Sequence, residues 1–417
     1  MIDFKRYSLN NGLKVLVHED NSTPLVAMNI IYDVGSRDED PDLTGMAHLF
    51  EHLMFGGSQN IPDFDTPLQM AGADNNAFTN NDFTNYYLTI PANNLETGFW
   101  LESDRMLGLS FSEEVLNIQK KVVIEEYKQR YLNQPYGDIM LILRPLAYKV
   151  HPYLWPAIGK NISHIERVTM TNVKDFFFSH YAPNNAILSV SGNIKHKEVL
   201  RLADKWFGPV NWREIALRRL AQEPVQKEKR LIEVERDVPS DVLYLTWHIC
   251  ARKEKDFNTL DLLTDILSGG ESGRLYSSLV RDKKLFSDIN AYLTGDYDPG
   301  LLIIYGKLMN GISFKSAEEA VIEVIEDIKK VAVPDAEMNK VKNKFESSMV
   351  FSNTCVLNKA MTLGFYELLG DANALNHEVE IYNSVNPEMV METATNYLKP
   401  DNCVSLQYKS RKPGKLL

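Results

Sequence analysis

The stretch HLFEHLMFGG at residues 48–57 is matched by DLLTDILSGG at residues 261–270, an offset of 261 − 48 = 213 positions. Both runs carry apolar residues at helical spacing and end in two glycines, which is typical of a helix and its C-terminal stop. A second pair, YAPNNAILSVSG from Tyr181 and YLKPDNCVSLQY from Tyr397, lies 397 − 181 = 216 positions apart. Both halves also open on a strand–turn–strand pattern. Three matches at nearly one offset indicate an internal duplication.

The pattern of elements predicts the fold class. Strand-like runs such as GLKVLVHED and KRLIEVERD open the two halves, and long helical segments follow at residues 112–132 and 316–332. This alternation predicts an α+β fold with two homologous α/β domains, each a mainly antiparallel sheet with helices packed on one face. We expect an N-terminal domain at residues 1–210 and a C-terminal domain at residues 231–417. The charged segment 211–230 between them reads as a linker with some helical character.

Composition excludes several classes of function. The 417-residue chain is 44% hydrophobic and has a formal net charge of −11, so nucleic acid is not an expected partner. No apolar run approaches the roughly 18 residues of a membrane span. The N-terminus lacks the apolar core of a signal peptide, which favours a cytoplasmic protein, or a periplasmic one if a leader has been removed. We expect Cys250, Cys355 and Cys403 to be buried free thiols.

The repeated helix carries a set of two histidines and a glutamate in the first half alone. Residues His48, Glu51 and His52 stand at positions i, i+3 and i+4, so their side chains leave one face of the helix. Two imidazoles one turn apart can bind one zinc ion, and a glutamate between them can take a proton from water. The second copy has Asp261, Thr264 and Asp265 at these positions. The helix therefore packs without the His/Glu set, which favours a site over a packing role.

A catalytic zinc ion needs a third protein ligand from another element. The long helix that begins near Ser112 offers Glu125 and Glu126. We expect Val115, Ile118 and Val122 to mark its buried stripe, and both glutamates flank that stripe. Periodicity leaves the choice between them open, and a solvated face is the alternative for either glutamate alone.

Four stretches together resemble a known family: GMAHLFEHLMFGG, AGADNNAFTNNDFTNYY, KKVVIEEYKQR and HPYLWPAIG. They are similar to the pitrilysin family of zinc metallopeptidases, or inverzincins, in which the motif has the order His-x-x-Glu-His. The chain resembles the zinc-bearing beta subunit of mitochondrial processing peptidase and related short bacterial-type peptidases. The duplicated architecture matches as well, so the resemblance covers essentially the whole chain and is most specific in the first half.

The resemblance assigns roles residue by residue. It implies one zinc ion per chain, with His48 and His52 as ligands and Glu51 as the general base. The family's spacing to its distal ligand selects Glu126, at 126 − 52 = 74 positions past the second histidine. Gln119 stands where the family often has an accessory glutamate, which leaves a weaker hydrogen bond behind the ligand.

The implied activity is hydrolysis of peptide bonds in unfolded peptides. The segment NNAFT resembles the family's edge strand, to which the substrate adds as an extra β-strand. Asn76 and Ala77 match positions that contact the substrate near the scissile bond. Without the resemblance, the same segment reads as a plain junction between a loop and a strand.

The second half departs from the family pattern. Arg281 matches a substrate-binding arginine, but the tyrosine expected seven residues later is Asp288, and a glycine that often precedes it is Leu285. An ionised aspartate cannot donate a hydrogen bond to an oxyanion. Tyr292, four residues further on, reads as a core or surface aromatic.

This departure motivates a two-chain hypothesis. We expect a homologous subunit without zinc to supply the Arg/Tyr pair, or else a homodimer. The alternatives are a structural subunit, like the core subunits of the respiratory cytochrome bc complex, and a peptide-binding module without turnover.

Overall fold

The structure is a computed structural model that describes residues 1–215 and 217–411. It contains two compact units, and each of them is assembled from separate stretches of the chain. The first unit consists of residues 1–130, 155–221 and 349–376, and the second of residues 131–154, 222–348 and 377 onward. Each unit is described by itself below.

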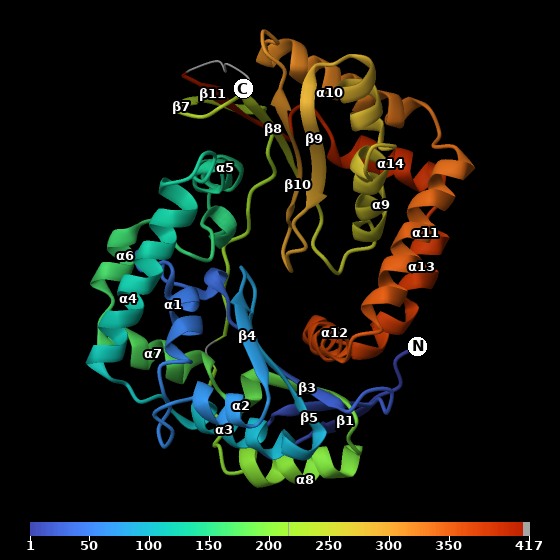
Figure 1. The fold of residues 1–417 in the computed structure, drawn as a ribbon. Coiled ribbons are helices and arrows are strands. Elements are labelled where there is room, and N and C mark those ends of the chain that lie inside the picture. Colours follow the sequence, from blue (N-terminus) through green and yellow to red (C-terminus); the bar gives the residue numbers. More distant parts are fainter. Residues whose placement is uncertain (216, 412–417) are drawn as a thin grey trace. The chain divides into compact units, whose positions relative to one another are not determined.

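The first unit is built on a six-stranded sheet with the strand order β1-β2-β6-β3-β5-β4 (Figure 1). Strands β2 and β6 are parallel, and the other neighbours are antiparallel. The bounds are β1 Lys5–Ser8, β2 Lys14–Glu19, β3 Leu25–Tyr32, β4 Asp74–Thr79, β5 Thr84–Pro91 and β6 Ala186–Gly192. Strand β4 has a neighbour on one side only, so it forms an edge of this sheet.

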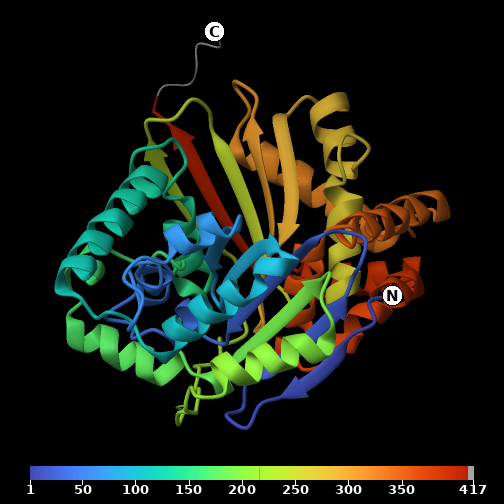
Figure 2. The same ribbon diagram turned by 60° about the horizontal axis from the view of Figure 1, so that its bottom comes forward.

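Helices cover both faces of the first sheet. Helix α3 (Leu95–Leu107) packs closely on one face, because a Cβ atom at Gly98 would lie 3.3 Å from Leu88. Helix α8 (His196–Phe207) packs against α3 and β2 and crosses the strands at the front of Figure 2. Helix α12 (Val356–Leu369) lies on the opposite face, against β3 and β6. This helix comes from the second half of the chain, as its orange-red colour shows (Figure 1).

Further helices complete the first unit beside the sheet. Helix α1 (Met46–Leu53) contacts both α4 (Glu113–Tyr127) and strand β4. Helix α4 continues into a π-helical turn, η3 (Lys128–Leu132). The remaining helices of this part are α2 Asp65–Met70, α6 Ile162–Arg167 and α7 Met170–His180. The predicted helix at residues 112–132 is therefore confirmed.

The predicted buried stripe of α4 is wrong at two of its three positions. Ile118 is 49% exposed and Val122 is 44% exposed. The buried residues of this helix are Leu116, Val123 and Tyr127. Both sets have helical spacing, so periodicity cannot choose between them. Contacts with α1 and α6 decide which set is buried.

The second unit repeats the topology of the first. Its five-stranded sheet has the order β7-β11-β8-β10-β9, and the red strand β11 lies between β7 and β8 in Figure 2. The bounds are β7 Arg230–Arg236, β8 Val242–His248, β9 Phe286–Leu293, β10 Leu301–Leu308 and β11 Cys403–Ser410. Strands β7 and β11 are parallel, as β2 and β6 are in the first unit. This match supports the internal duplication and confirms the α+β fold class.

The second sheet also has helices on both faces. The core on one face includes buried residues of α9 (Phe257–Ser268), α10 (Phe314–Lys330) and α14 (Pro387–Tyr397). Helices α11 (Asp335–Ser352) and α13 (Glu378–Ser384) add residues to this cluster. The other face is covered by α5 (Ile139–Ala147), which comes from the first half of the chain.

Each unit therefore carries one helix from the other half of the chain, in addition to the predicted helices on one face. These helices are α12 on the first sheet and α5 on the second. The boundaries 1–210, 211–230 and 231–417 follow the duplication in the sequence, and they stay a prediction.

Two smaller predictions are corrected. The described residues between 211 and 229 contain no helix, so the expected helical character of the linker is wrong there. Side chains hold this segment instead: Arg213 donates to the Tyr181 carbonyl at 2.6 Å, and Arg218 pairs with Asp38 at 2.5 Å. Cys250 and Cys403 are buried, but Cys355 is exposed because it precedes α12 at the surface. Among the described residues, no helix is long and apolar enough to cross a membrane.

Candidate metal centre

Helix α1 presents two histidines beside an apolar face. It buries Ala47, Leu49, Phe50 and Leu53 in the first unit. His48 and His52 follow one another by one helical turn, and their ring centroids lie 4.9 Å apart. The apolar positions thus fix the rotation of the helix, and that rotation sets where the imidazoles point.

Glu126 on α4 meets both imidazoles. Its Oε2 atom lies 3.6 Å from Nε2 of His48 and 3.4 Å from Nε2 of His52. Tetrahedral zinc with ligands at about 2.0–2.1 Å requires ligand atoms roughly 3.3–3.5 Å apart. The two separations from Glu126 are close to this value, and all three ligand atoms lie within 4.8 Å of one another, so the cluster could hold a zinc ion. Glu125 points elsewhere: its side chain is 60% exposed and pairs with Lys128.

The protonation states suit metal ligands. Burial lowers the pKa of His48 to about 4, so its imidazole is neutral at pH 7 and keeps a lone pair for a metal. A hydrogen bond from His52 lowers the pKa of Glu126, so this carboxyl group is ionised. Its second oxygen, Oε1, lies 3.1 Å from Nη1 of Arg130. The cluster thus offers two imidazoles and one carboxylate, and Arg130 orients the carboxylate through its second oxygen.

Glu51 lies on the same helix, next to the sheet edge. Its carboxyl group is hydrogen-bonded to the side chain of Thr79 at the end of β4. Burial raises the pKa of Glu51 above the ordinary value of a glutamate. A carboxylate with a raised pKa is a better proton acceptor near neutral pH.

Asn76 and Ala77 lie on the edge strand β4. The Asn80 N–H donates to the Phe83 carbonyl at 3.1 Å and closes the turn to β5. Because antiparallel pairing alternates, the N–H and C=O groups of Ala77 face away from β5, toward the free edge. The Ala77 N–H meets the side-chain Oδ1 of its neighbour Asn76 at 2.8 Å.

The second unit carries the other residues that the sequence singled out. Arg281 lies in the π-helix η6 (Tyr276–Asp282), is 62% exposed and pairs with Asp282 at 2.9 Å. Asp288 lies on the edge strand β9, where it accepts a hydrogen bond from Asn290. Tyr292 packs edge-on against Tyr305, as expected for a core or surface aromatic.

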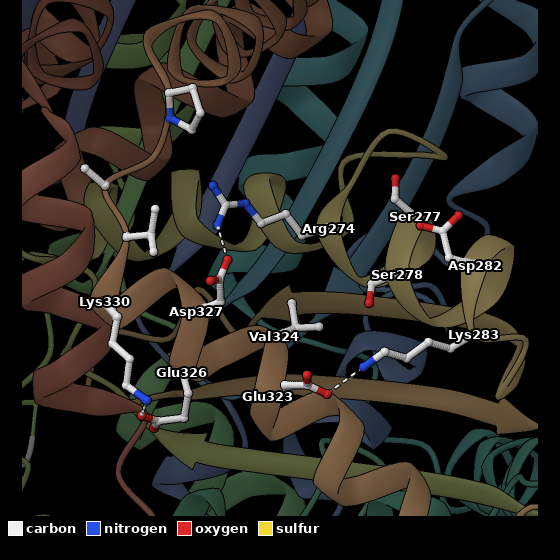
Figure 3. Close-up of a pocket in the computed structure, with 13 residues that line it drawn as sticks. Arg274, Ser277, Ser278, Asp282, Lys283, Glu323, Val324, Glu326, Asp327 and Lys330 are labelled. Atoms are coloured by element: carbon white, nitrogen blue, oxygen red, sulfur yellow. Dashed lines mark hydrogen bonds and ion pairs between the residues drawn. The ribbon is translucent and has the colours of Figure 1, made fainter.

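A pocket of about 650 Å³ lies beside η6 and the C-terminal end of α10 (Figure 3). Its cations pair with carboxylates: Arg274 with Asp327 and Glu337, Lys283 with Glu323, and Lys330 with Glu326. The group of potential metal ligands found among the described residues is the cluster on α1 and α4.

One buried group at this site, Glu39, was not among the residues predicted from the sequence. Glu39 precedes α1, and its carboxylate accepts the backbone N–H groups of Gly45 and Ala47. Burial raises the pKa of Glu39, whereas the N–H donors of Gly45, Ala47 and Trp155 lower it and favour the carboxylate. Its spacing to α1 is not a local capping pattern, so tertiary structure alone reveals the contact.

A duplicated α+β fold with a His-x-x-Glu-His helix and a distal glutamate defines a class of zinc-dependent hydrolases. Comparison with known proteins narrows this class. The family model "Insulinase (Peptidase family M16)" matches residues 14–137, and "Peptidase M16 inactive domain" matches residues 167–345. The chain belongs to this family, the M16 or pitrilysin family of peptidases.

The sequences of known relatives match this chain over nearly its whole length. The chain is 28% identical to zinc protease PqqE of Helicobacter pylori over 94% of its own length and 89% of that relative. It is 24% identical to the protein named uncharacterized zinc protease YmxG of Bacillus subtilis, over 96% of this chain and 97% of that relative.

Solved structures share the fold. The crystal structure of a protease from Helicobacter pylori matches with a TM-score of 0.93 and 27% identity, over 98% of this chain and all (100%) of that one. The crystal structure of pitrilysin matches with a TM-score of 0.80 and 19% identity, over 99% of this chain but 45% of that chain.

Proposed function

We propose that this protein is a zinc-dependent endopeptidase that hydrolyses unfolded peptides bound as an added strand along β4. The observation that carries the proposal is the spacing of His48, His52 and Glu126, with ligand atoms 3.4 and 3.6 Å apart beside the buried Glu51. The names of the relatives, zinc proteases, support the same activity.

The two histidines and Glu126 would hold one zinc ion per chain. Zinc supplies Lewis-acid polarisation of the scissile carbonyl and activates the attacking water. Glu51 accepts the proton of that water on its carboxylate and passes it to the leaving amine. Its raised pKa suits both transfers.

The edge strand would place the peptide. The outward N–H and C=O groups of Ala77 pair with the backbone of an extended substrate, and the Asn76 side chain, which accepts this N–H in the free protein, lies at the same place. Backbone pairing requires an extended chain, so unfolded peptides are favoured over folded proteins. Arg281, in the second unit, stays a predicted substrate-binding residue.

A second chain would complete the enzyme. Asp288 stands where the family has a tyrosine, so the Arg/Tyr pair is incomplete in this chain. We propose a homologous subunit without the zinc motif that supplies the Arg/Tyr pair, with a homodimer as the alternative. Co-purification from the native source, followed by mass spectrometry, tests this assembly. Full activity of the isolated monomer would contradict it.

A non-catalytic structural or peptide-binding subunit is the second candidate function. It is favoured by the description of the second family model as an inactive domain. Zinc content and turnover separate the two candidates. A peptidase binds one zinc per chain and loses cleavage in Glu51→Gln, whereas a non-catalytic subunit shows no cleavage that this substitution can remove.

A further inference from the structure

The carboxylate of Glu39 holds the first turn of the metal-bearing helix. Its Oε2 atom accepts the N–H of Gly45 at 2.8 Å, and its Oε1 atom accepts the N–H of Ala47 at 2.9 Å. Trp155 donates its indole N–H to the Ser36 carbonyl at 2.9 Å and to the same carboxylate at 3.1 Å. Glu39 is only 6% exposed, so water does not compete for these bonds. Since Gly45 has no side chain to cap the helix, Glu39 satisfies donors that would otherwise be orphaned.

The residues just before Glu39 hold a different element, the β4–β5 hairpin. Ser36 donates its N–H to the Asn80 carbonyl at 3.1 Å, and Arg37 donates its N–H to the Asn81 carbonyl at 2.9 Å. The Arg37 guanidinium pairs with Asp82 at 2.9 Å, and both side chains are 4% exposed. The buried ion pair and the backbone bonds together fix this end of the hairpin.

The β4–β5 hairpin lies in close contact with the backbone at Gly35. A Cβ atom at this position would lie 2.5 Å from the carbonyl carbon and oxygen of Asn81. No side chain fits in that space. The segment Gly35–Glu39 therefore touches the hairpin through its beginning and helix α1 through its end.

We propose that Gly35–Glu39 is a positioning segment that sets the metal cluster relative to the substrate-binding edge of β4. Glu39 fixes α1, and with it His48, Glu51 and His52, while Arg37 fixes the hairpin that begins with β4. Neither residue touches the metal or the peptide. The part that concerns the metal cluster rests on the proposed zinc site, and the part that concerns the peptide rests on the proposed cleavage of unfolded peptides.

The first experiment compares Glu39→Gln with Glu19→Gln in the full chain. Glu19 is a matched control, because its carboxylate also accepts the N–H at the start of a helix, from His196 of α8 at 2.8 Å. Helix α8 carries none of the predicted zinc ligands. The zinc dissociation constant is measured by competition with a chromophoric chelator, which requires no turnover.

We expect Glu39→Gln to weaken zinc binding about tenfold or more, because an amide presents one acceptor oxygen to two N–H donors. Glu19→Gln should stay within about twofold of the unchanged protein. Unchanged zinc binding in Glu39→Gln, or an equal loss in both variants, would overturn the role of Glu39. If Glu39→Gln does not fold, Trp155→Phe removes the indole donor to the carboxylate and keeps the aromatic packing. A smaller loss of zinc affinity supports the proposal there, and no loss overturns it.

The second experiment separates Arg37 from Glu39. Arg37→Met removes the ion pair with Asp82 and leaves the bonds from Glu39 to α1 intact. It is made in the Glu51→Gln background, so that a bound unfolded peptide is not consumed. We expect zinc affinity within about twofold and peptide affinity reduced at least about threefold. The proposal assigns helix α1 to Glu39 and the hairpin to Arg37. A loss of zinc affinity as large as that of Glu39→Gln, or unchanged peptide affinity, contradicts this assignment. If the unchanged protein binds no peptide, the proposed function fails, and the zinc comparison still decides the role of Glu39.

Discussion

The Oε2 atom of Glu126 lies 3.4 Å from Nε2 of His52, although the two residues are 126 − 52 = 74 positions apart on different helices. The contact exists because α1 and α4 pack against each other in the first unit. The ionised carboxylate of Glu126 lies beside two imidazoles in a partly buried cluster, which is an arrangement typical of metal ligands. This relationship leads to a direct test of the metal site.

Replacing Glu126 by Gln keeps the shape of the side chain and removes its charge. We expect zinc affinity to fall by about 100-fold or more, because a neutral amide is a poor zinc ligand. Isothermal titration with zinc measures the change. Glu125→Gln is the matched control, since its side chain is 60% exposed and pairs with Lys128. If both variants lose zinc equally, Glu126 is not the ligand.

Replacing Glu51 by Gln tests the proton transfer separately from the metal. The amide cannot accept a proton, so the cleavage rate should fall by about 10²–10⁴-fold. Zinc content should remain one per chain, because Glu51 lies outside the ligand set. Cleavage of a fluorogenic unfolded peptide and metal analysis of the same sample measure both quantities. Cleavage at the unchanged rate would remove Glu51 from the mechanism.

The sequence predicted the fold class and the residues of the cluster through patterns that are local or repeated. The motif His48, Glu51 and His52 lies within one helix, and the duplication appears as a constant offset. Glu126 required the family resemblance, because the apolar pattern of α4 fitted two faces and the exposed Ile118 and Val122 belong to the wrong one.

The contacts that the sequence did not reveal join elements distant in the chain. Lys359 of α12 pairs with Asp20 at 2.6 Å, across 359 − 20 = 339 positions. No periodicity predicts that α12 belongs to the first unit, because its apolar face fits any suitable sheet. The contacts of the buried Glu39 were not predictable either, because they depend on where the chain after β3 lies in the folded unit.

The pair of Asp20 and Lys359 makes stability depend on pH. The hydrogen bond from Lys359 holds the pKa of Asp20 well below its ordinary value of 3.8. A depressed folded pKa contributes stability that is present above the unfolded pKa and is lost as the pH falls below it. Asp20→Asn should therefore lower the free energy of unfolding by about 1–2 kcal/mol at pH 7 and flatten its fall between about pH 5 and pH 3.

Urea unfolding at several pH values measures this effect. Glu198→Gln is the control in the same unit, because the pair of Glu198 and Arg201 is exposed on both sides. Exposed pairs contribute about 0–1 kcal/mol, so this variant should follow the unchanged protein closely. Identical pH profiles for Asp20→Asn and the unchanged protein would show that the pair does not anchor α12.

The free edge of β4 gives the last prediction. Ala77→Pro removes an N–H group that faces away from β5, so the pairing with β5 should survive. We expect peptide affinity to fall by about tenfold, since one hydrogen bond to the added strand is lost and the proline ring obstructs the edge.

Asn76→Ala should raise peptide affinity instead. It removes the side-chain oxygen that holds the Ala77 N–H at 2.8 Å in the free protein, so the substrate meets an open donor. Peptide binding by the two variants in the Glu51→Gln background measures both changes, with zinc affinity as the check that the cluster is intact. Equal peptide affinity in both variants would show that the substrate does not pair with this edge.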